Sequence, residues 1–255
     1  MSLSRLNSFV IRDHNGQSFL AGEQHVHEIR TITLDLDDTL WAIAPVIARA
    51  EQHLYEWFGE HFPRIVEQFS MLEILALRNR VIEENLDRSH DLTFLRRSVI
   101  ARLGQEAGYD NIPIDTAFAV FDKIRNEPEL FPDVRPVLES LKTRYTLVAV
   151  TDGNANLDKI GISDLFDDFV SAQTAGAAKP DRRIYDAAVS IGGASQSQTL
   201  HVGDHPEKDV QGARDAGLKT VWINRVEADW PDTLAAPDRV VSDLYELDRI
   251  LVPLR

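Results

Sequence analysis

The sequence predicts an α/β protein with a Rossmann-like parallel sheet and an all-helical domain inserted after the first strand. Two observations predict this fold. From about residue 128 onward, short apolar runs alternate with helical segments, which is typical of a parallel sheet with helices on both faces. Between residues 42 and 126, apolar residues instead recur at spacings of three or four, and no segment resembles a strand.

The first predicted strand covers residues 31–36, which are rich in β-branched residues and run into a group of carboxylates. In the region of Pro128, Pro132 and Pro136 the pattern begins to alternate, and a helix at about 133–144 precedes an apolar strand at 146–150. The series continues with a short strand, a helix, a strand, a helix, a strand and a candidate last strand, at residues 169–171, 182–191, 199–203, 207–216, 219–223 and 239–241.

The helical block interrupts this series and is therefore best interpreted as an insertion. Prolines and glycines divide it into about four helices, at Pro63, Gly104, Gly108 and Pro113. We expect three parts: an N-terminal arm of residues 1–29, an α/β core of residues 30–41 and 128–255, and a helical cap of residues 42–127.

Composition excludes several classes of function. The chain has 41 acidic and 27 basic side chains and a formal charge of −14, which argues against general binding to nucleic acid or to anionic membranes. It contains no cysteine, so disulfides and thiolate chemistry are excluded and a cytoplasmic location is expected. The first 30 residues do not read as a secretory signal, and no apolar stretch approaches the roughly 18 residues of a membrane span.

Polar residues gather where predicted strands end, which is where ligands bind in such sheets. Asp35 and Asp37 follow the first strand, and two carboxylates this close require a cation or a proton between them. Asp204 follows Gly203 at a later strand end, with Asp209 in the next helix. Taken singly, these residues could equally form a solvated acidic turn or a helix cap.

Two further groups point to an anion. Thr151 ends the second long strand and precedes Asp152 and Gly153, so that a hydroxyl and backbone N–H groups can face a phosphate. Lys179 lies just before a helix that Pro180 helps to start. An ordinary turn and a solvated lysine are the alternatives, but the common placement of all four groups favours a single site.

These four groups resemble the motifs of the haloacid dehalogenase superfamily of phosphohydrolases. The matching residues are 35–39, Thr151, 179–180, and 203–204 together with Asp209. The resemblance implies that the helical insert is a cap of the first type found in that family. Asp152 stands where the family usually has asparagine, at a position that mainly presents its backbone N–H. The substitution adds a negative charge near the phosphate site.

The resemblance also implies catalytic roles. Asp35 attacks phosphorus and becomes an aspartyl phosphate. Asp37 protonates the leaving alcohol and then activates the water that hydrolyses the intermediate. Thr151 and Lys179 hold the phosphoryl group that is transferred.

A Mg²⁺ site is implied as well. Its ligands are the carboxylates of Asp35 and Asp204 and the backbone carbonyl of Asp37, an all-oxygen set that suits Mg²⁺ better than zinc. Asp209 is expected to orient Lys179 or a metal-bound water. With Asp37 protonated, three carboxylates balance Mg²⁺ and the lysine, so a phosphate dianion can enter a nearly neutral site.

Asp37 favours phosphoryl chemistry over dehalogenation, because an alkoxide leaving group needs a proton and a halide does not. Phosphonate hydrolases of the family need a lysine in the cap, whereas residues 42–122 contain none. A phosphomutase, a 2-haloacid dehalogenase and a protein that binds a phosphorylated metabolite without turnover remain alternatives. The expected partner is a small phosphorylated metabolite.

A looser resemblance concerns the substrate. Residues 41–47, 151–155 and 201–204 are similar to bacterial phosphatases of the riboflavin pathway, which act on FMN or 5-amino-6-(5-phospho-D-ribitylamino)uracil. Asp152 and Gly153 are then candidate substrate contacts. Trp41 could stack on a planar ring, or it could pack between cap and core.

Overall fold

A six-stranded parallel sheet forms the centre of the molecule, as the sequence predicts. The computed structural model describes residues 11–12, 18–19 and 29–251. The strand order is β5-β4-β3-β6-β7-β8, and every neighbouring pair is parallel. The strands are β3 (Thr31–Leu34), β4 (Thr146–Thr151), β5 (Asp168–Ser171), β6 (Thr199–Gly203), β7 (Lys219–Ile223) and β8 (Arg239–Val241).

Helices cover both faces of this sheet because its strands are apolar on both sides. In β4, Leu147 and Ala149 pack into one buried cluster, whereas Val148 and Val150 pack into another. The first cluster is covered by α6 (Val134–Lys142), α7 (Leu157–Ile160) and α11 (Leu244–Leu251). The second is covered by α8 (Ala172–Ala175), α9 (Arg182–Gly192) and α10 (Gly212–Asp215).

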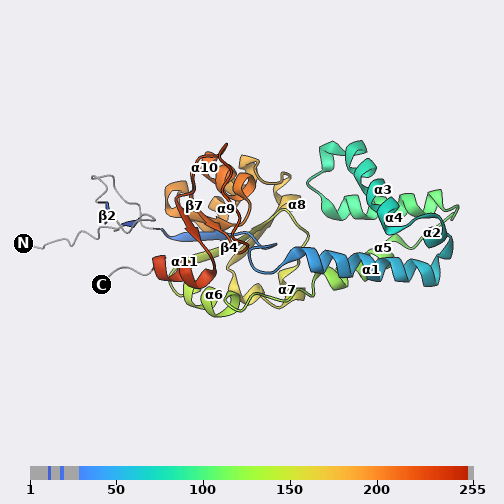
Figure 1. Ribbon diagram of the computed structural model, residues 1–255, viewed down its shortest axis with the longest axis horizontal. Coiled ribbons are helices and arrows are strands. Elements are labelled where there is room, and N and C mark those ends of the chain that lie inside the picture. The colour runs from blue at the N-terminus through green and yellow to red at the C-terminus, as the bar shows by residue number, and fades with distance from the viewer. Residues whose placement is uncertain (1–10, 13–17, 20–28, 252–255) are drawn as a thin grey trace, which may run out of the picture.

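The insert is helical throughout, with five α-helices where the sequence suggested about four. They are α1 (Ile43–His61), α2 (Pro63–Gln68), α3 (Met71–Glu84), α4 (Leu92–Glu106) and α5 (Ile114–Arg125), with a short 3₁₀ segment η1 (Leu86–Arg88). Pro63 separates α1 from α2, since proline cannot continue a helix but fits its first position. The insert has its own apolar core and lies at one end of the molecule (Figure 1). We therefore propose that residues 42–127 form a separate cap domain.

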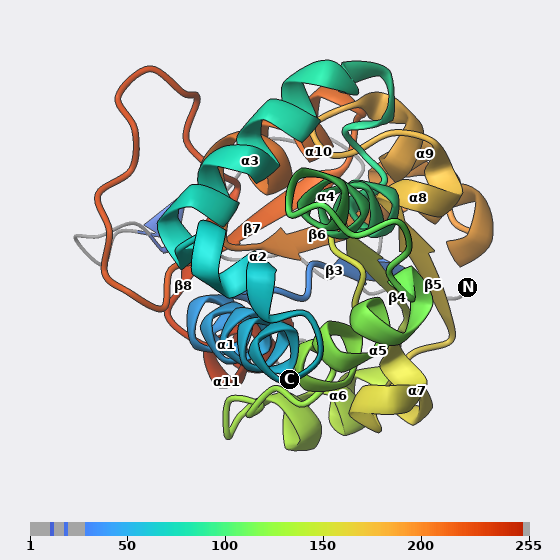
Figure 2. The same cartoon turned by 90° about the vertical axis from the view of Figure 1, so that its right-hand side faces the viewer.

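Besides its two chain connections, the cap contacts the core through polar side chains on both sides. Asn126 Oδ1 accepts from the backbone N–H of Asn156 at 2.7 Å, and Asp122 of α5 pairs with Lys159 of α7. On the other side, Gln173 Nε2 of α8 lies 3.4 Å from Asp91 Oδ1 before α4. Viewed from the cap end, the helices of the insert lie in front of the sheet (Figure 2).

The predicted helix at 207–216 forms in two parts. A π-helical segment, η4 (Pro206–Gln211), precedes α10. The carbonyl of His205 accepts from Asp209 N at 2.9 Å and from Val210 N at 3.4 Å, and the second of these bonds gives the wider turn. Such segments occur frequently at functional sites.

The predicted N-terminal arm is described only at two short strands. β1 (Ile11–Arg12) and β2 (Ser18–Phe19) pair in antiparallel fashion. Residues 1–10, 13–17, 20–28 and 252–255 lie outside the described part of the chain. Within the described part, no helix has the length and apolar character needed to cross a membrane.

Candidate active site

The carboxyl ends of β3 and β6 bring the predicted acidic residues together. Asp35 directly follows β3, and its backbone N–H donates to the carbonyl of Val202 in β6 at 2.9 Å. The residue is 6% exposed, and its Oδ1 accepts from Lys179 Nζ at 2.5 Å. Burial raises the pKa of Asp35, while the ammonium of Lys179 acts in the opposite direction.

Lys179 bridges two carboxylates. Its Nζ also donates to Asp209 Oδ1 at 2.6 Å, and both partners are buried. Asp209 additionally accepts from His205 N at 2.9 Å and contacts His201 Nε2 at 3.3 Å. Burial acts to raise the pKa of Asp209, but Lys179 and the hydrogen bond from His201 outweigh it and the net shift is downward.

Gly203 allows the side chain of Asp209 to lie against the end of β6. A Cβ at residue 203 would lie 2.3 Å from Asp209 Cγ, far inside van der Waals contact. Any other residue would therefore push Asp209 away from Lys179. The glycine at the end of β6 is needed for close packing between the strand end and η4.

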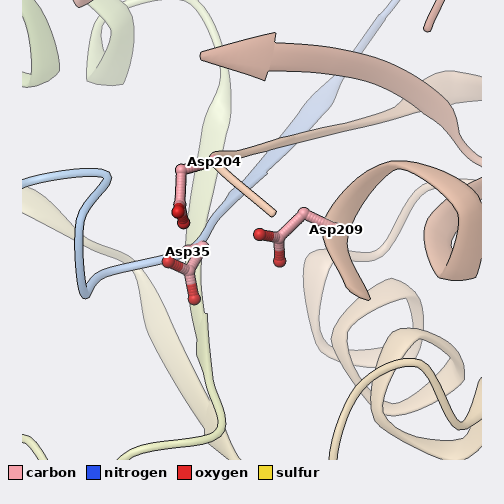
Figure 3. A group of neighbouring side chains, drawn as sticks. All are labelled: Asp35, Asp204 and Asp209. Atoms are coloured by element: carbon pink, nitrogen blue, oxygen red, sulfur yellow. The ribbon is translucent and has the colours of Figure 1, made fainter. Parts of the chain in front are cut away.

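Asp35, Asp204 and Asp209 form one cluster, in which one oxygen from each lies within 4.8 Å of the others. Their carboxylates turn toward a common space (Figure 3). Burial, followed by the charges of Asp209 and Asp38, raises the pKa of Asp204 to about 7. Crowded carboxylates with an all-oxygen ligand set fit a hard divalent cation such as Mg²⁺. Because both oxygens of Asp209 accept hydrogen bonds, Asp35 and Asp204 are the better candidates for direct ligands.

This cluster predicts a pH-dependent response of stability to Mg²⁺. The pKa of Asp204 in the metal-free fold, about 7, is above its ordinary value of 3.8. The stability that this group contributes is present below the ordinary pKa and is lost as the pH rises through about 7, because the fold then holds an unfavourable charge. Since protons compete with Mg²⁺, we expect Mg²⁺ to raise the melting temperature more at about pH 8 than at about pH 5.5. Differential scanning fluorimetry measures both values.

The variant Asp204→Asn is the control for this experiment. An amide does not titrate, so the rise in melting temperature that Mg²⁺ causes in this variant should be small and nearly the same at both pH values. Equal Mg²⁺-induced shifts of the wild-type protein at the two pH values would contradict the prediction.

Asp37 lies apart from this cluster and has different partners. Both of its oxygens contact Arg125 Nη2, at 2.9 and 2.8 Å, and Trp41 Nε1 donates to Oδ1 at 2.9 Å. Burial raises the pKa of Asp37, and the charge of Arg125 opposes this shift. The carboxylate of Asp37 is thus held by Arg125, from the cap helix α5, and by Trp41, four residues further along the chain.

The turn after β4 carries the predicted phosphate contacts. Thr151 Oγ1 accepts from Gly153 N at 2.9 Å. Asp152 Oδ1 accepts from the backbone N–H of Lys179 at 2.7 Å, and Asp152 Oδ2 pairs with Lys208 Nζ at 3.3 Å. The carboxylate at residue 152 therefore supports the lysine loop, and its charge is partly balanced by Lys208.

Trp41 is fully buried in the apolar cluster on one face of the sheet. Because the ring is not exposed, it cannot stack on a ligand in this conformation, as the sequence had suggested it could. The alternative of internal packing describes what is seen, with the indole N–H serving Asp37.

Sequence reasoning gave no role to three buried residues that support the site. Arg125 contacts Asp37, and His201 joins Asp209 to Thr33, whose Oγ1 lies 2.8 Å from His201 Nδ1. Tyr185 stacks edge-on against His201 and donates to the carbonyl of Lys208. A histidine within an apolar strand was the one signal in the sequence; nothing distinguished Arg125 from other arginines of the helical insert.

In this α/β fold, a buried lysine lies at the strand ends beside an acidic cluster suited to a cation. The chain belongs to the haloacid dehalogenase-like hydrolases, whose family pattern matches residues 29–217. It is 29% identical over 231 residues to the 5-amino-6-(5-phospho-D-ribitylamino)uracil phosphatase YigB of Escherichia coli (strain K12), which covers 88% of this chain and 96% of that protein.

Another curated relative and a solved structure give further examples that span most of the chain. A glyceraldehyde 3-phosphate phosphatase of Methanopyrus kandleri is 28% identical over 230 residues, covering 87% of this chain and 94% of the relative. A crystal structure described as a 2-haloacid dehalogenase from Pseudomonas syringae pv. Tomato DC3000 superposes with a TM-score of 0.82 at 34% identity, covering 88% of this chain and 98% of that one. The chain is thus a hydrolase of the phosphatase-containing family that its motifs resemble.

Proposed function

We propose that this protein is a Mg²⁺-dependent phosphomonoesterase that forms an aspartyl phosphate on Asp35. One observation carries the proposal above all others. A buried carboxylate paired with Lys179 lies in a cluster of oxygens close enough to share a cation, while a second carboxylate, Asp37, is held separately by Arg125. A nucleophile and an acid with different environments are what phosphoryl transfer through a carboxylate requires.

In the first step, a carboxylate oxygen of Asp35 forms a bond to phosphorus and the bond from phosphorus to the leaving oxygen breaks. The proton on Asp37 passes to that oxygen, so that an alcohol leaves instead of an alkoxide. Lys179 Nζ and Thr151 Oγ1 hold the oxygens of the transferring group, where negative charge is concentrated.

In the second step, the carboxylate of Asp37 takes a proton from water as the water oxygen attacks phosphorus. The bond between phosphorus and Asp35 breaks, which releases inorganic phosphate and restores the carboxylate. Asp37 thereby regains the proton it gave up, and no other reactant is needed.

The metal site in this proposal consists of Asp35, Asp204 and the backbone carbonyl of Asp37. Bound Mg²⁺ would offset the negative charge of the cluster and of the phosphate. Asp209 supports the site by holding Lys179, since its own oxygens are occupied by hydrogen bonds. The cap is expected to exclude water during attack and to open for release of the products.

The proposed substrate is a small phosphorylated metabolite. Relatives that span most of the chain are named as phosphatases of a ribitylaminouracil phosphate and of glyceraldehyde 3-phosphate. The relative from E. coli favours a ribitylaminouracil phosphate as the substrate. The resemblance of residues 41–47, 151–155 and 201–204 to phosphatases of the riboflavin pathway adds FMN as a candidate.

Dehalogenation is the second candidate, because a similar structure bears that description. Asp37 argues against it: a halide leaves without a proton, and a half-buried acid fixed by Arg125 would have no task. Release of chloride from 2-chloropropionate, measured beside release of phosphate, separates the two reactions.

A phosphate-release screen tests the proposed function. We expect Mg²⁺-dependent hydrolysis of p-nitrophenyl phosphate and stronger turnover of one class among sugar, nucleotide and flavin-pathway phosphates. Tight binding of a phosphorylated compound without release of phosphate would instead identify a binding protein. Transfer of the phosphoryl group to another position of the substrate would identify a mutase.

A further inference from the structure

We propose that Arg125 is the residue that positions Asp37 for protonation of the leaving group. This inference rests on the proposed function. Arg125 is the last residue of α5, the final helix of the cap, whereas Asp37 belongs to the core. The acid of the reaction would thus be held in place by the cap domain.

The contacts between these two residues determine where the carboxylate lies. Arg125 Nη2 is 2.9 Å from Asp37 Oδ1 and 2.8 Å from Oδ2, so that one nitrogen faces both oxygens. Trp41 Nε1 adds a third contact, at 2.9 Å from Oδ1. Donors on two sides restrict rotation of the side chain of Asp37, as a catalytic acid requires.

The turn after β4 leaves room for this pair. A Cβ at residue 153 would lie 2.7 Å from Asp37 Oδ2 and 3.0 Å from Arg125 Nη2. The same atom would be 3.2 Å from Thr151 Oγ1, the hydroxyl proposed to hold the phosphoryl group. Gly153 therefore places the arginine and carboxylate directly beside the phosphate-binding turn.

The burial of Arg125 is difficult to explain by stability alone. The residue is 1% exposed, and its second terminal nitrogen, Nη1, has no hydrogen-bond partner among the described residues. A buried cation with an unpaired donor is unfavourable for folding. The ion pair with Asp37, the one that Arg125 forms within the described part of the chain, is the feature that accounts for this position.

Proton transfer gives this contact a chemical purpose. Asp37 becomes a carboxylate when its proton passes to the leaving oxygen, and the guanidinium stabilises the charge that appears. A misplaced Asp37 would slow departure of an alkoxide but would hardly affect a leaving group that is stable without a proton. Dependence on the leaving group therefore separates positioning of the acid from a purely structural role.

The experiment compares Arg125→Met with the wild-type protein on two substrates. We measure kcat/KM for an alkyl phosphate and for 2,4-dinitrophenyl phosphate, because kcat/KM covers only the steps up to departure of the leaving group. For the alkyl phosphate we expect a loss on the order of 100-fold, in the range typical of general acid catalysis. For dinitrophenyl phosphate we expect a loss of less than about fivefold.

Three further variants sharpen the result. Arg125→Lys keeps the charge and should recover part of the activity on the alkyl phosphate. Trp41→Phe removes one donor to Asp37 while keeping an aromatic ring, and should give the same selective loss on a smaller scale. Arg49→Met makes the same change at an arginine that contacts the carbonyl of Glu127 instead of Asp37, and should leave both rates nearly unchanged.

The outcomes distinguish this inference from the proposed function. Suppose that the wild-type protein hydrolyses both substrates. If Arg125→Met then lowers kcat/KM for both substrates by the same factor, or for neither of them, the positioning role is wrong and the proposed function stands. If Arg125→Met does not fold, an unselective loss in Trp41→Phe has the same meaning. A wild-type protein that releases no phosphate from any substrate overturns the proposed function and this inference with it.

Discussion

Asp35→Asn is expected to reduce phosphate release by a factor on the order of 10⁴ or more. An amide has nearly the shape of the carboxylate but is a very poor nucleophile toward phosphorus. The buried pair with Lys179 shows that this side chain is held at the strand end and is not a solvated turn residue. Acid quenching of wild-type protein during turnover, followed by mass spectrometry, should find the phosphoryl group on the peptide that contains Asp35.

Asp38→Asn is the matched control for this variant. Asp38 lies in the same loop, is exposed, and uses Oδ1 to accept from the backbone N–H of Ile43 at 2.9 Å. Asparagine can accept the same bond and tolerates the left-handed backbone at this residue, where φ is 60°. We expect most of the activity to remain. Substantial turnover by Asp35→Asn, or a phosphoryl group found elsewhere, would contradict the assignment of the nucleophile.

Removal of divalent cations is the second change expected to have a large effect. Three carboxylates, on Asp35, Asp204 and Asp209, gather around the single ammonium of Lys179, which leaves two negative charges uncompensated when all three are ionised. Two unit charges 4 Å apart interact by about 4 kcal/mol at an effective dielectric near 20. A phosphate dianion should therefore be excluded, and activity should fall to the background rate.

Dialysis against a chelator tests this prediction. The metal content and the rate of phosphate release are then measured on the same sample. Added Mg²⁺ should restore turnover, and Asp204→Asn should need a much higher Mg²⁺ concentration. Asp243→Asn, in the loop before α11 on the core, should behave like the wild-type protein. Full activity in a sample with far less metal than protein would show that the cluster works without a divalent cation.

The fold was predictable because its strands and helices have strong local signals. Strands buried on both faces must be apolar along their whole length, so β4, β6 and β7 stand out from the sequence within a residue or two. The number of helices in the insert was less predictable, because whether Pro63 divides one helix or starts another depends on how the flanking apolar residues pack. The π-helical turn of η4 was also less predictable, because it has contacts that a local pattern does not encode. Tyr185, from the distant helix α9, donates to the carbonyl of Lys208, and the side chain of His205 accepts from the backbone N–H of Glu207.

The sequence by itself determined which carboxylates, hydroxyl and lysine stand at strand ends, because the carboxyl edge of a parallel sheet brings those ends together whatever the detailed packing. Only the tertiary structure decided how they are paired. It assigned Lys179 to Asp35 and Asp209, turned Asp152 toward the lysine loop, and buried Trp41. It also brought Arg125 to Asp37 across 88 residues of sequence, a contact that no local pattern encodes because it depends on how the cap closes back onto the core.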